Sequence, residues 1–299
     1  MKEFISKHRR WFGYPIYCIV LIVVLLYYRF PSEAFRDYVQ ITANNLNTPF
    51  SLSVHHIKPW PPFWLKLGKT ELTLKNEPSI TLFKADGLLV KPRAWAILQG
   101  DSKYCFECLA YRGDIEGCID FKSDNIKTSL FTAEMEAKNI QISDHHNLKD
   151  LIGRNASGTL YGTIKYGGEH KNLIKGFGEA DLKLLDGEIE FLVPLLNLES
   201  IKYNEIKIDM VLKEKRINLT HFELKGPMLK SMISGTISLK EKIGESTLDL
   251  KGIIEPHAEL FKNSSNLSET VMLLKQRLKK GTLPFTVRGT LDKPRIRFT

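Results

Sequence analysis

The feature that most constrains this chain is a period-two alternation of apolar and polar residues, which recurs from about residue 70 to about residue 260. Successive side chains of a β-strand point to opposite faces, so this alternation predicts strands with one apolar face and one solvated face. Segment 205–213, EIKIDMVLK, is typical. The alternation changes phase between Leu219 and Phe222, which predicts a β-bulge. Because glycines separate many of these segments, we predict a large, mostly antiparallel sheet.

Helical periodicity is confined to a few short segments. Apolar residues spaced three and four apart predict a helix at about 33–46, and short apolar stretches at 146–153 and 192–200 predict single helical turns. A longer amphipathic helix is expected at about 267–280, where basic residues gather near its C-terminal end. No linker rich in Pro, Gly or Ser divides residues 31–299, so we expect one continuous β-rich domain.

The N-terminal region predicts a membrane anchor. No residue from Trp11 to Tyr28 carries a formal charge, and a helix of this length reaches about 27 Å, close to the thickness of the hydrocarbon core. Basic residues precede this run, so the positive-inside rule predicts a cytoplasmic tail (1–10), a single transmembrane helix (11–30) and an exported domain (31–299). A cleaved signal peptide is the alternative, but the length of the apolar run favours an uncleaved anchor.

The net charge of +9 does not indicate a nucleic-acid partner. Residues 1–30 contain five basic residues and one acidic residue, which gives +4. The remaining excess is spread over the rest of the chain among many acidic residues. A nucleic-acid-binding domain would concentrate its basic residues on one face. We therefore expect no nucleic-acid partner.

Three cysteines lie in the expected exported domain, where disulfides persist. A disulfide from Cys118 to either Cys105 or Cys108 is expected, with one thiol left over. The C-x-x-C spacing of Cys105 and Cys108 also matches a redox pair, but the segment YCFECLAY has the pattern of a strand and does not begin a helix. A zinc site would need a fourth ligand, and no histidine lies nearby in sequence.

The sequence contains no recognisable catalytic centre. Two histidine pairs, His55-His56 and His145-His146, are adjacent in sequence. Neighbours on a regular strand point to opposite faces, so neither pair could chelate one ion. Motifs for a nucleophile elbow, a zinc protease or a phosphate-binding loop are absent from the sequence. We expect no catalytic residues, no metal and no cofactor.

The last seventeen residues, LPFTVRGTLDKPRIRFT, predict a final edge strand. Phe285, Val287 and Leu291 share one parity, and Pro294 suits an edge because it cannot donate to a ladder. Arg288 and other basic residues would discourage unwanted pairing at this edge. The same edge could instead accept a strand from a partner, with Phe285, Val287, Arg288 and Leu291 as the docking residues.

The order of these features resembles the AsmA-like proteins of the bacterial envelope, and within them the family of type II secretion system protein N (GspN). The resemblance is one of pattern and spacing and covers most of residues 10–299. The segments that carry it are FSLSVHHIKPWPPFWLKLGKTELTL, LFKADGLLVKPRAWAILQG, NLKDLIGRNASGTLYGTIKY, GEADLKLLDGEIEF and VRGTLDKPRIRF.

This resemblance implies a single-pass protein of the bacterial inner membrane with a periplasmic domain. That domain would be an elongated, twisted, mostly antiparallel sheet, curled into a groove whose apolar face accommodates lipid acyl chains. The implied function is a non-enzymatic component of the type II secretion system that binds the secretin and the inner-membrane platform. The alternative is an AsmA-like lipid-binding or lipid-transfer protein that supports outer-membrane biogenesis and binds phospholipid.

Overall fold

The structure is a computed structural model that describes residues 14–298 except for the ranges 15–16, 19–20, 23, 26, 46–49, 62–63, 76–80, 93–101, 122–129, 146–148, 150–153, 170–171, 196–197 and 260–280. Helix α3 covers Ser32–Asn45, and short 3-10 turns are η1 (Ile142–Asp144), η2 (Leu173–Lys175) and η3 (Ile243–Glu245). The strands are β1 (Phe50–Trp60), β2 (Trp64–Leu74), β3 (Thr81–Pro92), β4 (Ser102–Ala110), β5 (Gly113–Phe121), β6 (Leu130–Gln141), β7 (Thr159–Glu169), β8 (Phe177–Leu195), β9 (Leu198–Lys213), β10 (Arg216–Lys225), β11 (Leu229–Ser238), β12 (Thr247–Pro256), β13 (Leu283–Thr290) and β14 (Pro294–Phe298).

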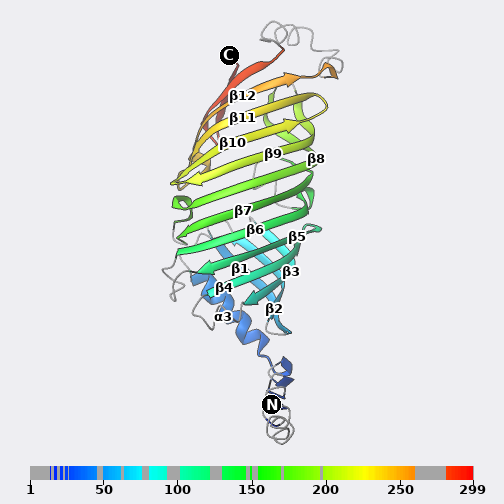
Figure 1. Cartoon of the computed structure of the whole chain (residues 1–299), viewed down its shortest axis with the longest axis vertical. Helices are drawn as coiled ribbons and strands as arrows, with labels where there is room; N and C mark the ends of the chain where they lie inside the picture. The colour runs from blue at the N-terminus through cyan, green and yellow to red at the C-terminus, as the bar shows by residue number, and fades with distance from the viewer. Residues whose placement is uncertain are drawn as a thin grey trace, which may run out of the picture.

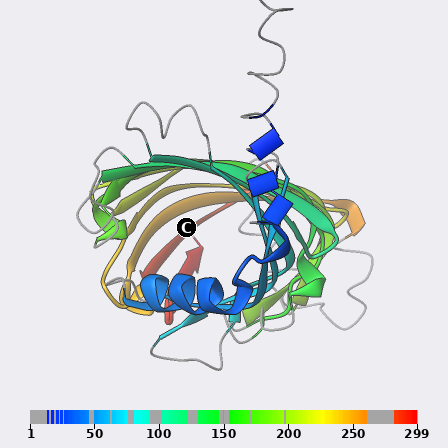
Figure 2. The same ribbon diagram turned by 90° about the horizontal axis from the view of Figure 1, so that it is seen from below.

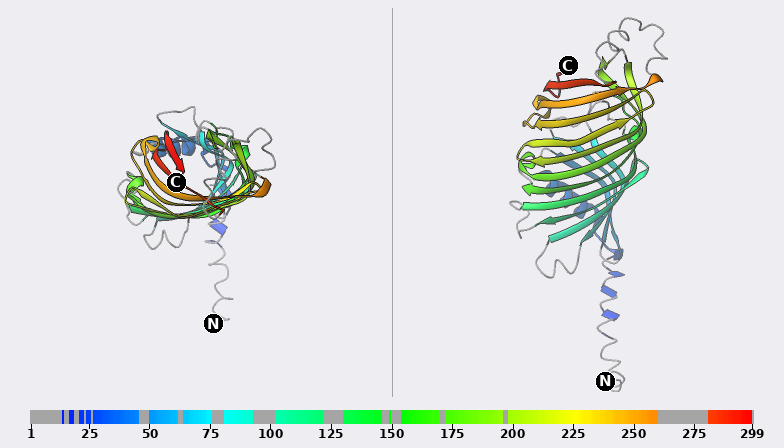
Figure 3. Two further views of the ribbon diagram at one scale, coloured as in Figure 1. Left: turned by 90° about the horizontal axis from the view of Figure 1, so that it is seen from above. Right: turned by 45° about the horizontal axis from the view of Figure 1, so that its top comes forward.

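All of these strands form a single antiparallel sheet. Its 14 strands follow one another in sequence order, and each pairs with the next. The strands cross the long axis one after another, from β1 beside α3 to the last strands beside the C-terminus (Figure 1). Seen along that axis, they curve around a central space (Figure 2), and the view from the opposite end shows the same curve (Figure 3). The predicted large antiparallel sheet is confirmed.

The predicted membrane anchor is contradicted. Within the described residues, none of the helices combines the length and the apolar character needed to cross a bilayer. The expected transmembrane helix at 11–30 is therefore corrected. Helix α3 itself has 14 residues and reaches about 21 Å, which is shorter than a hydrocarbon core of about 30 Å.

Some of the shorter predicted elements are confirmed and one is wrong. The helix expected at 33–46 is confirmed as α3, and the bulge is confirmed by a register shift between Leu219 and Phe222. The helical turn expected at 192–200 is wrong, because the chain there forms the paired ends of β8 and β9. The helix at 267–280 lies outside the described residues, as does the turn at 146–153 apart from Lys149.

The predicted single C-terminal strand is two strands. β13 and β14 form a hairpin in which Phe285 lies opposite Phe298 and Gly289 lies opposite Pro294. Gly289 has φ of 105°, a backbone conformation that glycine adopts without strain. Lys293 N donates to Thr290 O over 3.1 Å and closes the turn. The edge of the sheet is therefore β14.

Helix α3 covers the first strand both on its face and along its edge. Phe35 and Val39 pack against the buried cluster of the first two strands, which contains Val54. Along the edge, Leu52 N donates to Asn44 Oδ1 over 2.8 Å, and Asn44 Nδ2 donates to Leu52 O over 3.3 Å. These amide contacts satisfy backbone groups that a neighbouring strand would otherwise pair, which protects the edge.

We call the face on which α3 packs the inner face. Residues that are directly opposite in antiparallel strands lie on the same face, so the register traces a row across the whole sheet. Every member of this row is apolar or glycine. The row runs through Ile57, Leu67, Leu88, Cys108, Ile115, Ala137, Gly162, Leu182, Ile208, Phe222, Ile233, Gly252, Phe285 and Phe298.

The inner face stays apolar although the alternation changes phase within several strands. On β2, Leu67 and Thr70 are both buried although they differ in parity, and Lys69 between them has φ of 47°. Asn139 has φ of 59° and lies within a register shift of β6. A left-handed residue of this kind turns the following side chains back to the original face.

Candidate functional site

The candidate site is the middle of the inner face, between two buried clusters. One cluster lies under α3, and a larger one extends from β8 to β14 around Ile206 and Leu283. A small third cluster lies at β3 and β4. Among the described residues, the inner-face side chains of β4–β7 that we call the central floor belong to none of these clusters and are only half-buried. They are Tyr104, Phe106, Ile119, Phe121, Phe131, Ala133, Met135, Ile164 and Tyr166.

Four aromatic rings of the central floor form what we call the aromatic row. The rings of Tyr104 and Phe121 are 6.2 Å apart, those of Phe121 and Phe131 are also 6.2 Å apart, and those of Phe131 and Tyr166 are 5.4 Å apart. Each ring comes from a different strand, β4 to β7. Partial burial raises the pKa of the Tyr166 hydroxyl. The Tyr166 ring is therefore neutral at physiological pH.

Small residues keep the central floor shallow. Gly117 lies opposite Phe106 across β4 and β5, and a Cβ on Gly117 would lie 2.8 Å from Cζ of the Phe106 ring. A Cβ on Gly162 would likewise lie 2.6 Å from Cδ2 of Leu182. Because these glycines have no side chain, their neighbours lie across them. The floor is consequently smooth, apolar and free of charged side chains among the described residues of β4–β7.

The outer face has the opposite character. Lys138 Nζ lies 2.6 Å from Glu116 and 3.1 Å from Glu136, and Glu223 accepts ion pairs from Lys230 at 3.0 Å and Lys225 at 3.1 Å. Contact with Lys138 lowers the pKa of the Glu116 carboxyl, and contact with lysines lowers the pKa of the Glu223 carboxyl. These exposed pairs keep the outer face charged and solvated, so the sheet has one wet face and one apolar face.

The outer face also carries a hollow of about 710 Å³ beside Trp60 and Leu109. These two side chains are exposed by 45% and 63%. Two lysines of the hollow interact with neighbouring side chains: Lys66 Nζ lies 5.2 Å from the centre of the Trp60 ring, and Lys138 pairs with Glu116.

The cysteines of β4 and β5 form one disulfide and leave one buried thiol. Cys105 and Cys118 lie directly opposite each other on β4 and β5 and form a disulfide. Cys108 is buried on the inner face, three residues from Cys105 and therefore on the opposite side of the strand. Burial, with a smaller contribution from Asp114, raises the pKa of the Cys108 thiol to about 11. This geometry rules out a Cys105–Cys108 redox pair, which needs a reactive thiolate beside its partner.

The predicted docking residues do not lie on the sheet edge. Phe285, Val287 and Arg288 belong to β13, which pairs with β12 on one side and β14 on the other. Leu291 lies in the turn between β13 and β14, where its N–H donates to Ser246 O over 3.0 Å. A partner strand could reach only the free side of β14, which sequence analysis did not separate from β13.

The described residues contain no group of three or more His, Cys, Asp or Glu side chains placed to hold a metal ion. His55 and His56 are both exposed on β1, and His145 Nε2 lies 2.9 Å from Leu82 O. The aromatic row was missed by sequence analysis because its members are far apart in the chain. Only the correct register of β4–β7 would have shown that these four rings are neighbours.

Comparison with known proteins identifies no relative. The chain matches no family model, no curated protein and no solved structure.

Proposed function

We propose that this chain is a non-enzymatic lipid-binding protein that holds acyl chains of a phospholipid along the central floor. The observation that carries this proposal is the half-exposed apolar surface of β4–β7, which has no covering element among the described residues. Contiguous apolar surfaces of this kind mark binding sites. The resemblance to AsmA-like proteins supports the same reading.

The shape and chemistry of the floor suit an acyl chain. Strands in a sheet are about 4.8 Å apart, so β4 to β7 extend the floor by about 14 Å across the sheet. Each methylene group removed from water contributes about 0.8 kcal/mol, and the contact needs no hydrogen-bond partner. The smooth surface over Gly117 and Gly162 imposes no polar specificity on the chain.

A pair of adjacent substitutions tests the proposal. Ile164 is on the inner face, opposite Met135 and Ala180, whereas Thr163 is on the outer face and exposed. Ile164→Asp would place a carboxylate against the acyl chain, and Thr163→Asp would place the same group in water. Native mass spectrometry and lipid extraction of the purified proteins should show phospholipid in the wild type and in Thr163→Asp, with at least tenfold less in Ile164→Asp.

Circular dichroism must show that both variants are folded. If Ile164→Asp does not fold, Met135→Gln offers a milder polar substitution on the same floor. Absence of lipid from the wild type, together with no binding of a fluorescent fatty acid, would refute the proposal. Equal lipid content in the two aspartate variants would also refute it.

The second candidate is a component of the type II secretion system that binds the secretin or the platform subunits. One observation favours it: the outer side of β14 is unpaired among the described residues, and Arg295 and Arg297 are exposed there. An edge of this kind can accept an acidic strand from a partner. The Arg295→Glu, Arg297→Glu double variant should then fail to capture purified secretin or platform subunits, and unimpaired export in a strain that lacks the protein would exclude this role.

A further inference from the structure

The hollow of about 710 Å³ beside Trp60, which we call the outer-face hollow, lies on the opposite side of the sheet from the central floor. Leu88 and Cys108 belong to the inner-face row, so their neighbours Leu89 and Leu109 point to the outer face. Together with the Trp60 ring, these two leucines give the hollow an apolar wall. Its volume is within the range of small-molecule sites.

Gly87 leaves the middle of the outer-face hollow open. It lies opposite Gly68 on β2 and Leu109 on β4. A Cβ on Gly87 would have no described atom within 4 Å apart from its chain neighbours, and its backbone is not left-handed. The large side chains of Trp60 and Leu109 line the same hollow and are exposed. The apolar part of a ligand could therefore occupy the space that a side chain at position 87 would fill.

Two carboxylates of the outer-face hollow are available to a ligand. Asp86 and Asp114 are exposed, and within the part of the chain that the structure describes neither forms an ion pair. Lys138 lies opposite Asp114 in the register, but its Nζ pairs with Glu116 at 2.6 Å. Burial raises the pKa of the Cys108 thiol, and Asp114 and Asp86 both add to this effect, so the two carboxylates lie near the same point of the sheet.

The balance of charge in the outer-face hollow favours a cation. The charged side chains that line it are Lys66, Asp86, Glu107, Asp114, Glu116 and Lys138. Both lysines are already engaged, Lys138 by Glu116 and Lys66 by the Trp60 ring, whose centre lies 5.2 Å from Lys66 Nζ. An aromatic face attracts ammonium groups, so the apolar wall is itself suited to a cationic ligand.

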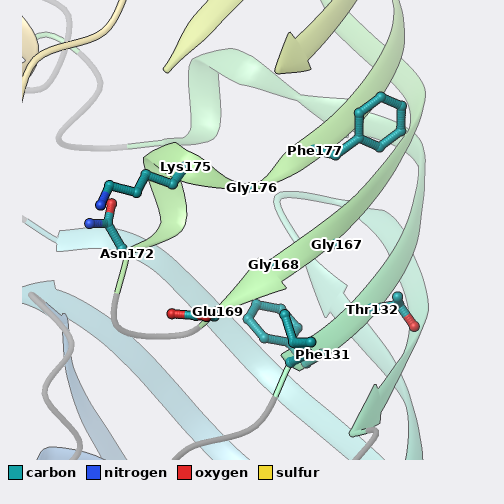
Figure 4. Close-up of a pocket in the computed structure, with 10 residues that line it drawn as sticks. Phe131, Thr132, Gly167, Gly168, Glu169, Asn172, Lys175, Gly176 and Phe177 are labelled. Carbon is teal, nitrogen blue, oxygen red and sulfur yellow. The ribbon is translucent and has the colours of Figure 1, made fainter. Parts of the chain in front are cut away.

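The pocket where β6, β7 and β8 meet the turn η2 offers a useful contrast (Figure 4). Its volume is about 660 Å³, and its lining combines Glu169 with Lys175. The Lys175 side chain extends toward Asn172 in this pocket (Figure 4). A cation would meet an ammonium group there as well as a carboxylate. Glu169 is therefore a suitable control for the carboxylates of the outer-face hollow.

We infer that the outer-face hollow binds a small amphipathic amine, whose apolar body lies over Gly87 between Trp60 and Leu109 and whose ammonium donates to Asp86 and Asp114. This inference does not rest on the proposed function, because the hollow and the central floor lie on opposite faces. A partner strand does not suit the hollow, since β2 to β5 each pair with a strand on both sides and offer no free edge.

The test compares two probes on the intact chain by saturation-transfer NMR. Phenethylamine and hydrocinnamate share a phenyl ring and a two-carbon linker and carry opposite charges. Each is titrated into the wild type, Gly87→Val, the double variant Asp86→Asn, Asp114→Asn and the control Glu169→Gln. We expect the wild type and the control to bind phenethylamine at least tenfold more tightly than hydrocinnamate, the contribution of one charge-assisted hydrogen bond.

Each variant of the hollow has a separate expected result. Gly87→Val should fill the hollow and weaken phenethylamine at least tenfold without lowering the melting temperature, because its Cβ enters open space. The double asparagine variant should bind the two probes equally. Equal binding of both probes by the wild type, or no binding of phenethylamine, would refute the inference. Wild-type affinity for phenethylamine in both Gly87→Val and the double variant would refute it as well, and none of these results bears on the acyl site of the inner face.

Discussion

The amide contacts between α3 and β1 allow a quantitative test of how this sheet protects its first edge. Asn44 makes two hydrogen bonds to the backbone of Leu52, at 2.8 and 3.3 Å, and Gln40 Nε2 donates to Val54 O over 3.4 Å. A hydrogen bond of this kind contributes about 1 kcal/mol net. Asn44→Ala should therefore lower the free energy of unfolding by about 2 kcal/mol, or the melting temperature by about 4 to 8 °C.

The neighbouring Asn45 is a matched control, because it has the same side chain on the same helix but is exposed. Guanidinium denaturation followed by circular dichroism should show a lower midpoint for Asn44→Ala than for Asn45→Ala. Removal of Gln40 as well should leave the edge of β1 open to a second copy, which analytical ultracentrifugation would detect as a concentration-dependent dimer. Equal midpoints for Asn44→Ala and Asn45→Ala would show that these amides do not cap the edge.

Three further predictions concern the disulfide, the buried thiol and the larger buried cluster around Ile206. Replacing both Cys105 and Cys118 by Ala should lower the free energy of unfolding by about 3 kcal/mol in a denaturant titration, as expected for a short closed loop of sequence separation 13. An unchanged midpoint would show that this disulfide does not stabilise the fold. Burial raises the pKa of Cys108 to about 11 in the folded protein, so the unfolded chain loses this proton at a lower pH. The free energy of unfolding should therefore fall as pH rises from about 9 to about 11. Cys108→Ala should remove this contribution to the pH dependence. Ile206→Ala, at 1% exposure, should cost about 3 kcal/mol, whereas Ile243→Ala, at 66% exposure, should change the midpoint little.

The strands could be predicted from sequence because side-chain parity is a local property of the chain. Segment 205–213 alternates through most of its length and lies within β9, and the phase change between Leu219 and Phe222 appears as a register shift. The membrane anchor was predicted from apolar length and flanking charge, and the described residues contradict it. Hydropathy reports how a segment partitions between solvents. It does not fix the extent of a helix.

Other features depend on contacts that the sequence does not encode locally. Lys69 has φ of 47°, yet it is not a glycine and lies in no recognisable turn motif. The aromatic row depends on the pairing of four strands. The C-terminal hairpin, in contrast, did carry a signal: Gly289 at the start and Pro294 at the end enclose a polar turn that could have been separated from the strand.

The curvature of the sheet bears on what can cover the central floor. An apolar sheet face needs a second layer, and among the described elements α3 provides one only for the first strands. The outer face of another copy would bring charged residues such as Glu116 and Lys138 against the aromatic row, which is unfavourable without compensation. The inner face of another copy is concave as well (Figure 2), so two such faces could meet at their rims but not at their floors. A narrow, flexible and apolar occupant satisfies both constraints, and this geometric argument favours an acyl chain over a second protein molecule.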